Sequence, residues 1–349
     1  MVKRLSQVLL AMSLFVGCAT HRPAEARRPA APTPVERLGP LRVVDNRIVG
    51  KSGTPAVLAG MSLFWTVWGG ERFFNKDVVD WLATDWRCSV VRVPAAVEPR
   101  GGYLSHPDLV VARVRAAVDA AIARGLYVII DWHEEHADQH VEKAKAFFAT
   151  MAKTYGRVPN VLFEIWNEPA GNVEPIPTWP QIKAYAQAVI PVIREHSPNL
   201  IIIGTPFWSQ RVDLAADDPV PGENLAYSLH FYAGSHGKEL RDKADYALAK
   251  GVPLFITEWG TSNADGGNMD KTVYTAASAD WLAWAGRNHL SWANWSVMDK
   301  QEASSILLPD ESDEAMDGLP DKGHWPESRL TASGKWVKAR IAEANRDAR

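Results

Sequence analysis

The sequence predicts an α/β protein, a (β/α)8 TIM barrel that forms a single domain. From about Ala56 onward, short apolar runs alternate with amphipathic stretches, which is the pattern of βα units around a parallel sheet. The runs begin roughly 25 to 40 residues apart, the length of a strand, a helix and two loops. The eight expected strands are 57–63, 89–93, 127–131, 161–165, 200–204, 226–230, 254–257 and 290–294.

The helices between these strands have recognisable ends. Thr178 and Gln181, for example, fit a capping box that opens a helix running to about His196. The same units could also build a doubly wound open sheet. That fold binds phosphates with a glycine-rich turn, and neither G-x-G-x-x-G nor G-x-x-x-x-G-K-[ST] occurs. The barrel is therefore favoured.

The first 40 residues differ from the rest of the chain. Residues 1–18 have a basic start and an apolar stretch ending at Cys18, which is typical of an export signal. The tail around Cys18 resembles a lipoprotein cleavage box, so we expect either outer-membrane anchoring through a lipidated Cys18 or free secretion. Residues 19–40 are rich in Pro, Ala and Arg and predict a flexible or polyproline-like linker. Residues 41–349 remain for the barrel domain.

Charge and cysteine content argue against two classes of function. The net charge is −3, and residues 1–40 carry +4, so the remainder carries −7. A mildly acidic domain argues against nucleic acid as the ligand. Cys88 lies in an apolar stretch and is expected to be a buried thiol, not a nucleophile. We expect a monomer.

Two glutamates stand at the ends of predicted strands. Glu168 follows the fourth strand and Glu258 ends the seventh, 90 positions later. All strands of a barrel point their carboxyl ends into one mouth, so these side chains can meet. Glycoside hydrolysis needs such a pair, and gives retention of configuration at a separation of about 5 Å and inversion at roughly 6.5–9.5 Å. The sequence does not decide between the two.

With these motifs the chain resembles glycoside hydrolase family five, and within it the bacterial endoglucanases of subfamily two, over roughly residues 41 to 341. The resemblance rests on Asn167-Glu168-Pro169, Glu258-Trp259-Gly260, Asn75-Lys76-Asp77, Asp131-Trp132-His133, His230-Phe231-Tyr232 and Asp299-Lys300-Gln301-Glu302. It implies a retaining endo-β-1,4-glucanase, or cellulase, that acts on a β-glucan polysaccharide without a cofactor.

The resemblance also implies a role for each matching residue. Glu168 would be the general acid/base and Glu258 the nucleophile. Arg92 would lie near Glu258 and keep it ionised, and Tyr232 would donate a hydrogen bond to the same carboxylate. Asn167 would bind the sugar 2-hydroxyl. The further substrate-binding residues would be His133 and His230 around the cleaved unit, Trp295 as a stacking platform, Lys300 and Glu302 on the non-reducing side, and Trp208 on the leaving-group side.

The chain departs from the family near the first two strands. Leu63-Phe64-Trp65 stands where many members have a His, and Ala95-Ala96 stands where they have a Tyr. We therefore expect Trp65 or Trp68 to take over sugar stacking there.

Several alternatives remain open from the sequence. Glu164 can be a buried structural carboxylate and is not assigned a catalytic role. His133, His136 and His140 could bind zinc, but they lack the H-E-x-x-H order, so we predict no metal site and expect a solvated loop. The same fold could act on mannan, xylan or mixed-linkage β-glucan. A lapsed enzyme that only binds glucan at the cell surface is a further alternative.

Overall fold

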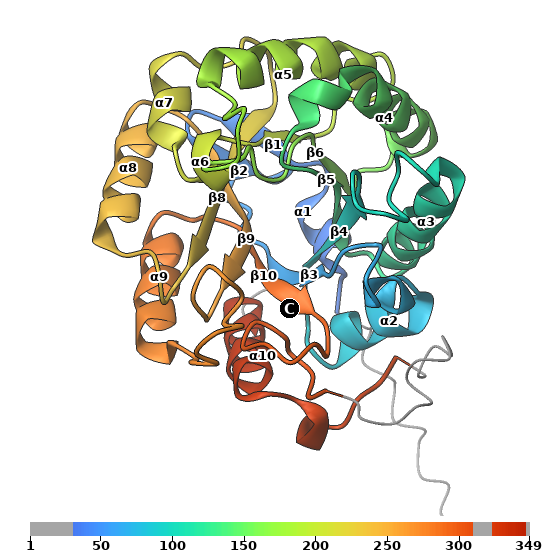
Figure 1. Cartoon of the computed structure of the whole chain (residues 1–349), viewed down its shortest axis with the longest axis vertical. Helices are drawn as coiled ribbons and strands as arrows, with labels where there is room; N and C mark the ends of the chain where they lie inside the picture. Colours follow the sequence, from blue (N-terminus) through green and yellow to red (C-terminus); the bar gives the residue numbers. More distant parts are fainter. Residues whose placement is uncertain (1–30, 310–322, 347–349) are drawn as a thin grey trace, which may run out of the picture. The chain divides into compact units, whose positions relative to one another are not determined.

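The predicted barrel is confirmed in a computed structural model, which describes residues 31–309 and 323–346. Eight strands close in the order β10-β3-β4-β5-β6-β7-β8-β9, and each pairs with its neighbours in parallel. Figure 1 looks down this barrel. The strands are β3 (Ala59–Leu63), β4 (Val90–Ala96), β5 (Tyr127–His133), β6 (Val161–Glu164), β7 (Ile201–Ile203), β8 (Leu225–Tyr232), β9 (Leu254–Gly260) and β10 (Trp292–Val297).

Helices connect the strands and form the outer ring seen in Figure 1. They are α2 (Lys76–Thr84), α3 (Pro107–Ala123), α4 (Val141–Tyr155), α5 (Trp179–Arg194), α6 (Pro206–Ser209), α7 (Val212–Asp217), α8 (Lys238–Ala249), α9 (Thr275–Arg287) and α10 (Ala332–Ala344), with short 3-10 turns η1 (Gly70–Phe73), η2 (Ala137–His140) and η4 (Glu327–Arg329). The capping box of Thr178 and Gln181 opens α5. Among the described residues, no helix is long and apolar enough to cross a membrane.

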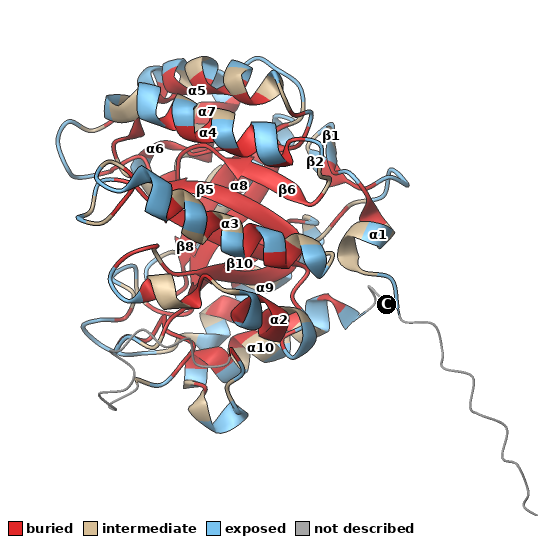
Figure 2. Ribbon diagram, turned by 90° about the vertical axis from the view of Figure 1, so that its right-hand side faces the viewer, coloured by how far each residue is buried: buried red, intermediate tan, exposed pale blue. Residues whose placement is uncertain are grey.

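Two apolar clusters hold the barrel together. The larger one lies between the strands and the helices and includes the fully buried rings of Trp81, Trp132 and Trp281. The smaller one fills the interior of the barrel and includes Ile129 and Phe255. Figure 2 shows the strands buried along their length, while each helix exposes one face. This two-layer burial is why the predicted strands read as continuous apolar runs.

The barrel interior changes from apolar to charged along the strands. Inward positions alternate with outward ones, and five of the strands bring a polar residue two positions after an apolar one. The pairs are Val90 and Arg92 on β4, Ile129 and Asp131 on β5, Leu162 and Glu164 on β6, Ala226 and Ser228 on β8, and Phe255 and Thr257 on β9. All of these polar residues are fully buried. The carboxyl-terminal half of the barrel therefore carries a charged core.

The predicted linker over residues 19–40 is wrong in its last part. Pro34–Leu38 form a short helix, α1, because Thr33 and Glu36 make a capping box and Pro34 occupies the first helical turn. The Tyr127 hydroxyl donates a hydrogen bond to the Gly39 carbonyl oxygen, and Leu38 joins the inner apolar cluster. A two-stranded sheet, β1 (Arg42–Val44) and β2 (Arg47–Val49), follows. The compact unit therefore begins at Pro32.

The predicted export signal over residues 1–18, with Cys18, lies outside the described residues, as does most of the predicted linker. Cys88 is buried, as expected, and burial raises the pKa of its thiol.

Candidate active site

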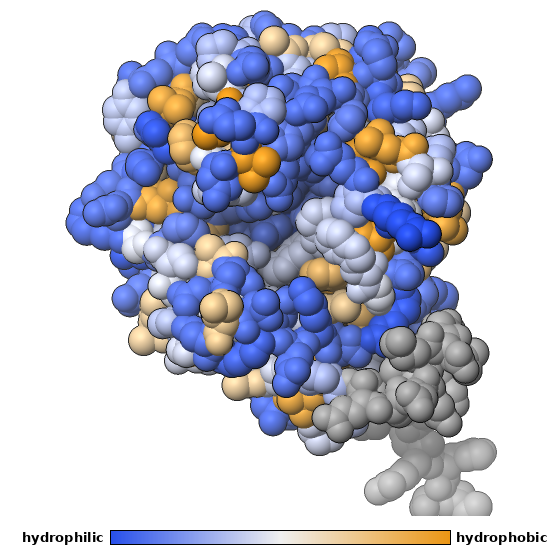
Figure 3. All heavy atoms as spheres, in the orientation of Figure 1, coloured by the Kyte–Doolittle hydropathy of each residue, from blue (hydrophilic) through white to orange (hydrophobic). Residues whose placement is uncertain are grey.

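The polar side chains gather at the mouth formed by the carboxyl ends of the strands. Figure 1 views the barrel from this side, and Figure 3 shows the same face hollowed across its middle, with hydrophilic residues on much of the rim. Glu168 follows β6 and Glu258 lies on β9. The mouth is therefore where the two predicted glutamates meet.

Glu258 is held by two donors, one on each carboxylate oxygen. Arg92 Nη1 donates to Oε2 over 2.9 Å, and the Tyr232 hydroxyl donates to Oε1 over 2.7 Å. Burial by itself would raise the pKa of this carboxyl, but the positive charges of His230 and Arg92 outweigh it, so its pKa lies below the usual value. Glu258 is therefore ionised and oriented.

Arg92 is the centre of a buried charge network. Its side chain is fully buried, and its Nε donates to Glu164 over 2.7 Å. Nη2 lies 3.0 Å from an Asp131 oxygen and 2.5 Å from the Asn167 side-chain oxygen. One guanidinium thus fixes Glu258, Glu164 and the Asn167 amide together, because its several N–H donors point in fixed directions.

Glu168 lies in a different environment from Glu258. Its Oε1 accepts a hydrogen bond from His230 Nδ1 over 2.8 Å. Burial, and then the charge of Glu258, raise the pKa of Glu168 to about 7. The burial of the His230 ring would lower its pKa, but the neighbouring carboxylates of Glu164 and Glu168 outweigh it and raise the pKa to about 9. Glu168 can therefore hold a proton near neutral pH, beside an imidazolium.

The gap between the two glutamates matches one of the two glycosidase geometries. One carboxylate oxygen of Glu168, one of Glu258 and a His230 nitrogen all lie within 4.8 Å of one another. A carboxyl gap of about 5 Å leaves no room for a water between the second carboxylate and the sugar, whereas an inverting pair needs roughly 6.5–9.5 Å. The geometry is therefore that of a nucleophile and an acid/base.

Aromatic rings continue the site to one side. Trp295 is 6% exposed, and its ring stacks on His133 with centroids 5.3 Å apart. Trp65 meets the edge of the same imidazole at 4.3 Å and contacts Trp68 at 4.9 Å. His133 donates from Nδ1 to Asp131, and burial lowers the pKa of His133 to about 3. Its ring is therefore neutral, and its Nε2 is an acceptor.

The predicted pair after β10 lies next to this aromatic wall. Lys300 Nζ is 2.9 Å from Glu302 Oε2 and 5.8 Å from the centre of the Phe64 ring, which in turn packs on Trp295. Ser304 donates to the other Glu302 oxygen. Phe64, which lies where the sequence departs from the family pattern, thus packs between Lys300 and Trp295.

Trp208 is held close to the Asn-Glu-Pro motif. Its backbone N–H donates to the Pro169 carbonyl oxygen over 2.8 Å, and its ring covers Gly171 so closely that a Cβ there would lie 2.4 Å from it. Trp208 sits in the left-handed backbone region, at φ 54°. All thirteen predicted site residues thus lie at or beside the barrel mouth.

The sequence reasoning missed the supports of the site. Asp131 holds His133, and Thr257 bridges His230 and Glu164 by accepting a hydrogen bond from His230 over 2.8 Å and donating one to Glu164 over 2.6 Å. Glu164, anticipated as a buried carboxylate, also accepts from Ser228. Arg92 and His230 lower the pKa of Glu164 to about 2 despite its burial. The available signal was a polar residue at an inward strand position, shared by Asp131, Glu164 and Thr257.

The histidine run after β5 differs from its expected form. His136 and His140 do not stand on an α-helix, since η2 spans Ala137–His140. Nor is the segment a solvated loop, because Glu134 is 3% exposed and His136 is 8% exposed. The loop folds back over the end of β5 and buries polar side chains.

Comparison with known proteins agrees with this site. The family model described as cellulase (glycosyl hydrolase family 5) matches residues 49–301. The chain is 47% identical over 276 residues to endoglucanase Z of Dickeya dadantii, an alignment that covers 78% of this chain and 62% of that protein. It is 44% identical over 285 residues to endoglucanase N of Pectobacterium atrosepticum, covering 80% of this chain and 62% of that protein.

Solved structures show the same fold. A protein from Cytophaga hutchinsonii superimposes with a TM-score of 0.84 at 41% identity, covering 91% of this chain and 99% of that one. The catalytic domain of Thermobifida fusca endoglucanase Cel5A gives 0.80 at 32% identity, with 89% and 99% covered. The chain spans about 62% of the length of the two endoglucanases that it matches above.

Proposed function

We propose that this chain, which belongs to the cellulase family, glycosyl hydrolase family 5, is a retaining endo-β-1,4-glucanase. The observation that carries the proposal is the Glu168–Glu258 pair, with oxygens within 4.8 Å and pKa values moved in opposite directions. Two carboxyls separated in this way divide the roles of acid and nucleophile. The relatives named endoglucanase support β-1,4-glucan as the substrate.

In the first step, Glu258 attacks the anomeric carbon while Glu168 gives its proton to the departing glycosidic oxygen. The bond to the leaving sugar breaks, and an ester forms between Glu258 and the remaining sugar. Arg92 and Tyr232 hold the attacking carboxylate, so little reorientation is needed. The Asn167 amide, fixed by Arg92, is free to donate to the sugar 2-hydroxyl.

In the second step, Glu168 is the base. It takes a proton from a water molecule, whose oxygen attacks the anomeric carbon and releases Glu258. Two inversions give net retention, and both glutamates return to their starting protonation states. His230 stays hydrogen-bonded to Glu168 and can stabilise its anionic form between the steps.

The proposed glucan lies across the mouth. The neutral His133 can accept a hydroxyl proton at Nε2, and Trp295 offers a ring to the apolar face of the cleaved unit. Trp65, Trp68, Lys300 and Glu302 would bind units on the non-reducing side, and Trp208 the leaving-group side. A Thermobifida fusca Cel5A variant has been solved in complex with cellotetraose, at 31% identity to this chain, which favours a binding site for several glucose units.

A substrate panel tests the proposal. The purified protein should release reducing ends from carboxymethyl cellulose and mixed-linkage β-glucan faster than from mannan or xylan, and nuclear magnetic resonance should show the β-anomer first. Glu258→Gln should abolish release on every substrate. Faster turnover of mannan or xylan would reassign the sugar, and α-anomer as the first product would overturn retention. Absence of turnover on the whole panel would favour a glucan-binding protein.

We also propose export from the cytoplasm with anchoring through Cys18. The basic start, the apolar stretch and the Cys-containing box of residues 1–18 support this proposal. Labelling cells with a radioactive fatty acid should mark the wild-type protein and leave Cys18→Ala unlabelled. Equal labelling of both proteins, or of neither, would refute the lipid anchor.

A further inference from the structure

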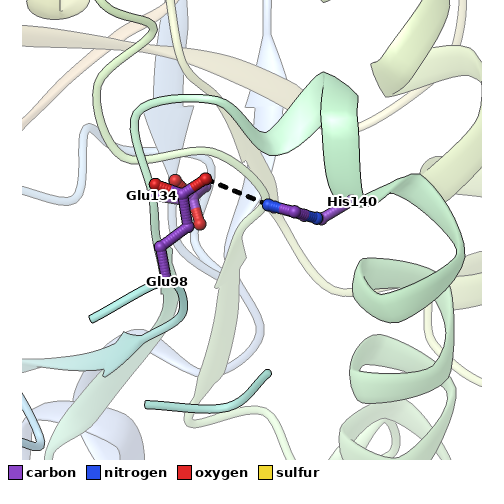
Figure 4. Close-up of side chains that lie close together, drawn as sticks. All are labelled: Glu98, Glu134 and His140. Atoms are coloured by element: carbon purple, nitrogen blue, oxygen red, sulfur yellow. Dashed lines mark hydrogen bonds and ion pairs between the residues drawn. The ribbon is translucent and has the colours of Figure 1, made fainter. Parts of the chain in front are cut away.

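We propose that Glu98, Glu134 and His140 form a binding site for a first-row divalent metal ion such as Zn²⁺, separate from the catalytic centre. One carboxylate oxygen from each glutamate and one nitrogen of His140 lie within 4.8 Å of one another. Figure 4 shows the two carboxylates side by side with the imidazole pointing toward them. The inference does not rest on the glucanase proposal, since binding can be measured directly.

The barrel itself brings these residues together. β4 and β5 are neighbours, with Ala96 paired to His133. Glu98 comes two residues after β4 and Glu134 one residue after β5, so both leave the sheet at the same edge. His140 ends η2 and precedes α4. The loop from Glu134 to His140 therefore turns back toward the β4 end and places the imidazole opposite the glutamates.

Glu134 is prepared to act as a ligand. It is 3% exposed, and its Oε1 accepts hydrogen bonds from the backbone N–H groups of Glu135 and His136 over 2.9 and 3.1 Å. Within the described part of the chain, its other oxygen, Oε2, is buried and has no hydrogen-bond partner. A buried carboxylate oxygen without a partner is costly. A bound cation would satisfy it, and the backbone contacts already fix the carboxylate orientation.

The charge of the cluster calls for a cation. Among the described residues, the only ion-pair partner of Glu98 is His140, at 3.0 Å, and Glu134 has none. Burial, together with the charge of Glu98, raises the pKa of Glu134 to about 8. A divalent ion would neutralise both carboxylates and bind the neutral imidazole, since metal ligands must be deprotonated.

The donor set selects the type of ion. One imidazole nitrogen and two carboxylate oxygens suit Zn²⁺, whereas Ca²⁺ and Mg²⁺ prefer oxygen ligands alone. Three protein ligands leave a coordination position for water, as in open zinc sites. That position can face the adjoining pocket of about 320 Å³, which is lined by Trp65, Trp68, His133 and both glutamates.

The catalytic cluster offers a contrast. Glu168, His230 and Glu258 also lie within 4.8 Å of one another. However, both Glu258 oxygens already accept from Arg92 and Tyr232, and the guanidinium supplies the positive charge. The buried Oε2 of Glu134 lacks any such donor among the described residues. The difference favours metal binding at the Glu98 cluster.

Isothermal titration with ZnCl₂ tests the site on the full chain carrying Cys18→Ser, so that this thiol adds no second site. We expect the parent to bind one Zn²⁺ per chain. Losing an outer-shell partner of a metal typically lowers affinity roughly 10- to 100-fold, and we expect Glu134→Gln and His140→Gln, which remove direct ligands, each to lower the Zn²⁺ affinity by more than that. Glu135→Gln, a neighbour that lines the same pocket, is the matched control and should bind within about twofold of the parent. Co²⁺ absorption should report the imidazole ligand in the parent and disappear in His140→Gln.

Three results would overturn the proposal. One is a parent protein that takes up no Zn²⁺. Another is Zn²⁺ binding that Glu168→Gln removes and Glu134→Gln leaves unchanged, which would place the ion in the catalytic cluster. The last is equal binding of Zn²⁺ by the parent and by His140→Gln, which would exclude the histidine as a ligand. Circular dichroism of each variant should match that of the parent. If a variant is less stable, the Co²⁺ absorption spectrum still reports whether the imidazole is a ligand in the folded protein.

Discussion

The carboxylates of Glu168 and Glu258 lie within 4.8 Å of each other, yet their surroundings move their pKa values apart. Burial and the neighbouring charge of Glu258 raise the pKa of Glu168 to about 7. The Glu258 side chain is more buried, 5% exposed against 19% for Glu168, but His230 and Arg92 outweigh the burial and lower its pKa. One acid is therefore protonated and the other ionised over the same pH range. Substitution of each should therefore impair a different step of the reaction.

Glu168→Gln should retain part of its activity on an activated substrate. A dinitrophenyl cellobioside has a leaving group that departs without protonation, so the first step does not need the acid. We expect glycosylation of Glu168→Gln to stay near the parental rate and to appear as a burst, while cellulose hydrolysis falls by about 10²- to 10⁴-fold. Glu258→Gln should lose both reactions. Stopped-flow absorbance measures the burst.

The surface variant Glu239→Gln, on α8, is the control and should match the parent on both substrates. A burst in Glu258→Gln but none in Glu168→Gln would exchange the two roles.

The rate should fall as pH rises through about 7. Glu168 must carry its proton to protonate the leaving oxygen, and its pKa is about 7. Glu258 must be ionised, and because its pKa is lowered from 4.5, the acid limb of the profile should lie below about that pH. The measurement is kcat/KM on a soluble glucan from pH 3 to 10. In Glu168→Gln, the residual rate on the activated glycoside should lose its alkaline limb. An alkaline limb that persists near pH 9 would indicate titration of His230 instead.

The sequence was a good guide to the strands and to the acids at their ends. Continuous apolar runs identify strands that are buried on both faces, and Glu168 and Glu258 follow from strand ends meeting in one mouth. It was a poor guide to features that depend on which side chains pack together. Glu164 and Asp131 look like ordinary acids until Arg92 is seen between them. The segment after β5 shows the same limit, since the sequence predicted a solvated loop there and the structure buries Glu134 and His136.

Glu164 should stabilise the protein in a pH-dependent way. Its pKa in the folded state is lowered to about 2 from 4.5, so its contribution is full above about 4.5 and is lost as pH falls toward 2. Glu164→Gln leaves Arg92 with one partner fewer in a fully buried site. We expect a loss of about 3–5 kcal/mol in the free energy of unfolding at pH 7, and a smaller difference at pH 3. Urea unfolding at the two pH values measures it.

The control for this experiment is Glu142→Gln, which removes an exposed ion pair with Lys145 and should cost less than about 1 kcal/mol at either pH. An equal loss for Glu164→Gln at pH 7 and pH 3 would contradict the assigned pKa.

The helix α1 should contribute to the stability of the barrel. A chain that begins at Pro32 keeps α1 with Leu38 in the inner cluster, whereas one that begins at Leu41 loses both. Losing a buried leucine costs about 2–5 kcal/mol, so the shorter chain should unfold at lower urea concentration. Leu38→Ala in the longer chain should reproduce much of the loss. Equal midpoints for the two chains would restore the linker prediction for residues 34–40.

Trp68 should affect the binding of long glucans and leave the chemical step unchanged. Its ring is 60% exposed and packs on Trp65, which contacts His133. It is thus removed from the catalytic pair, and its loss uncovers little core. An aromatic contact is worth about 0.5–1.5 kcal/mol, so Trp68→Ala should raise KM for cellohexaose by roughly 2- to 12-fold. The value of kcat should stay constant, and KM for an aryl cellobioside, which is too short to reach the ring, should not change. Phe207→Ala, which removes another exposed ring within α6, is the matched control for non-specific surface effects. A parallel rise in KM for the short substrate would mean that Trp68 acts by positioning Trp65 against His133, and not by contacting a distant sugar.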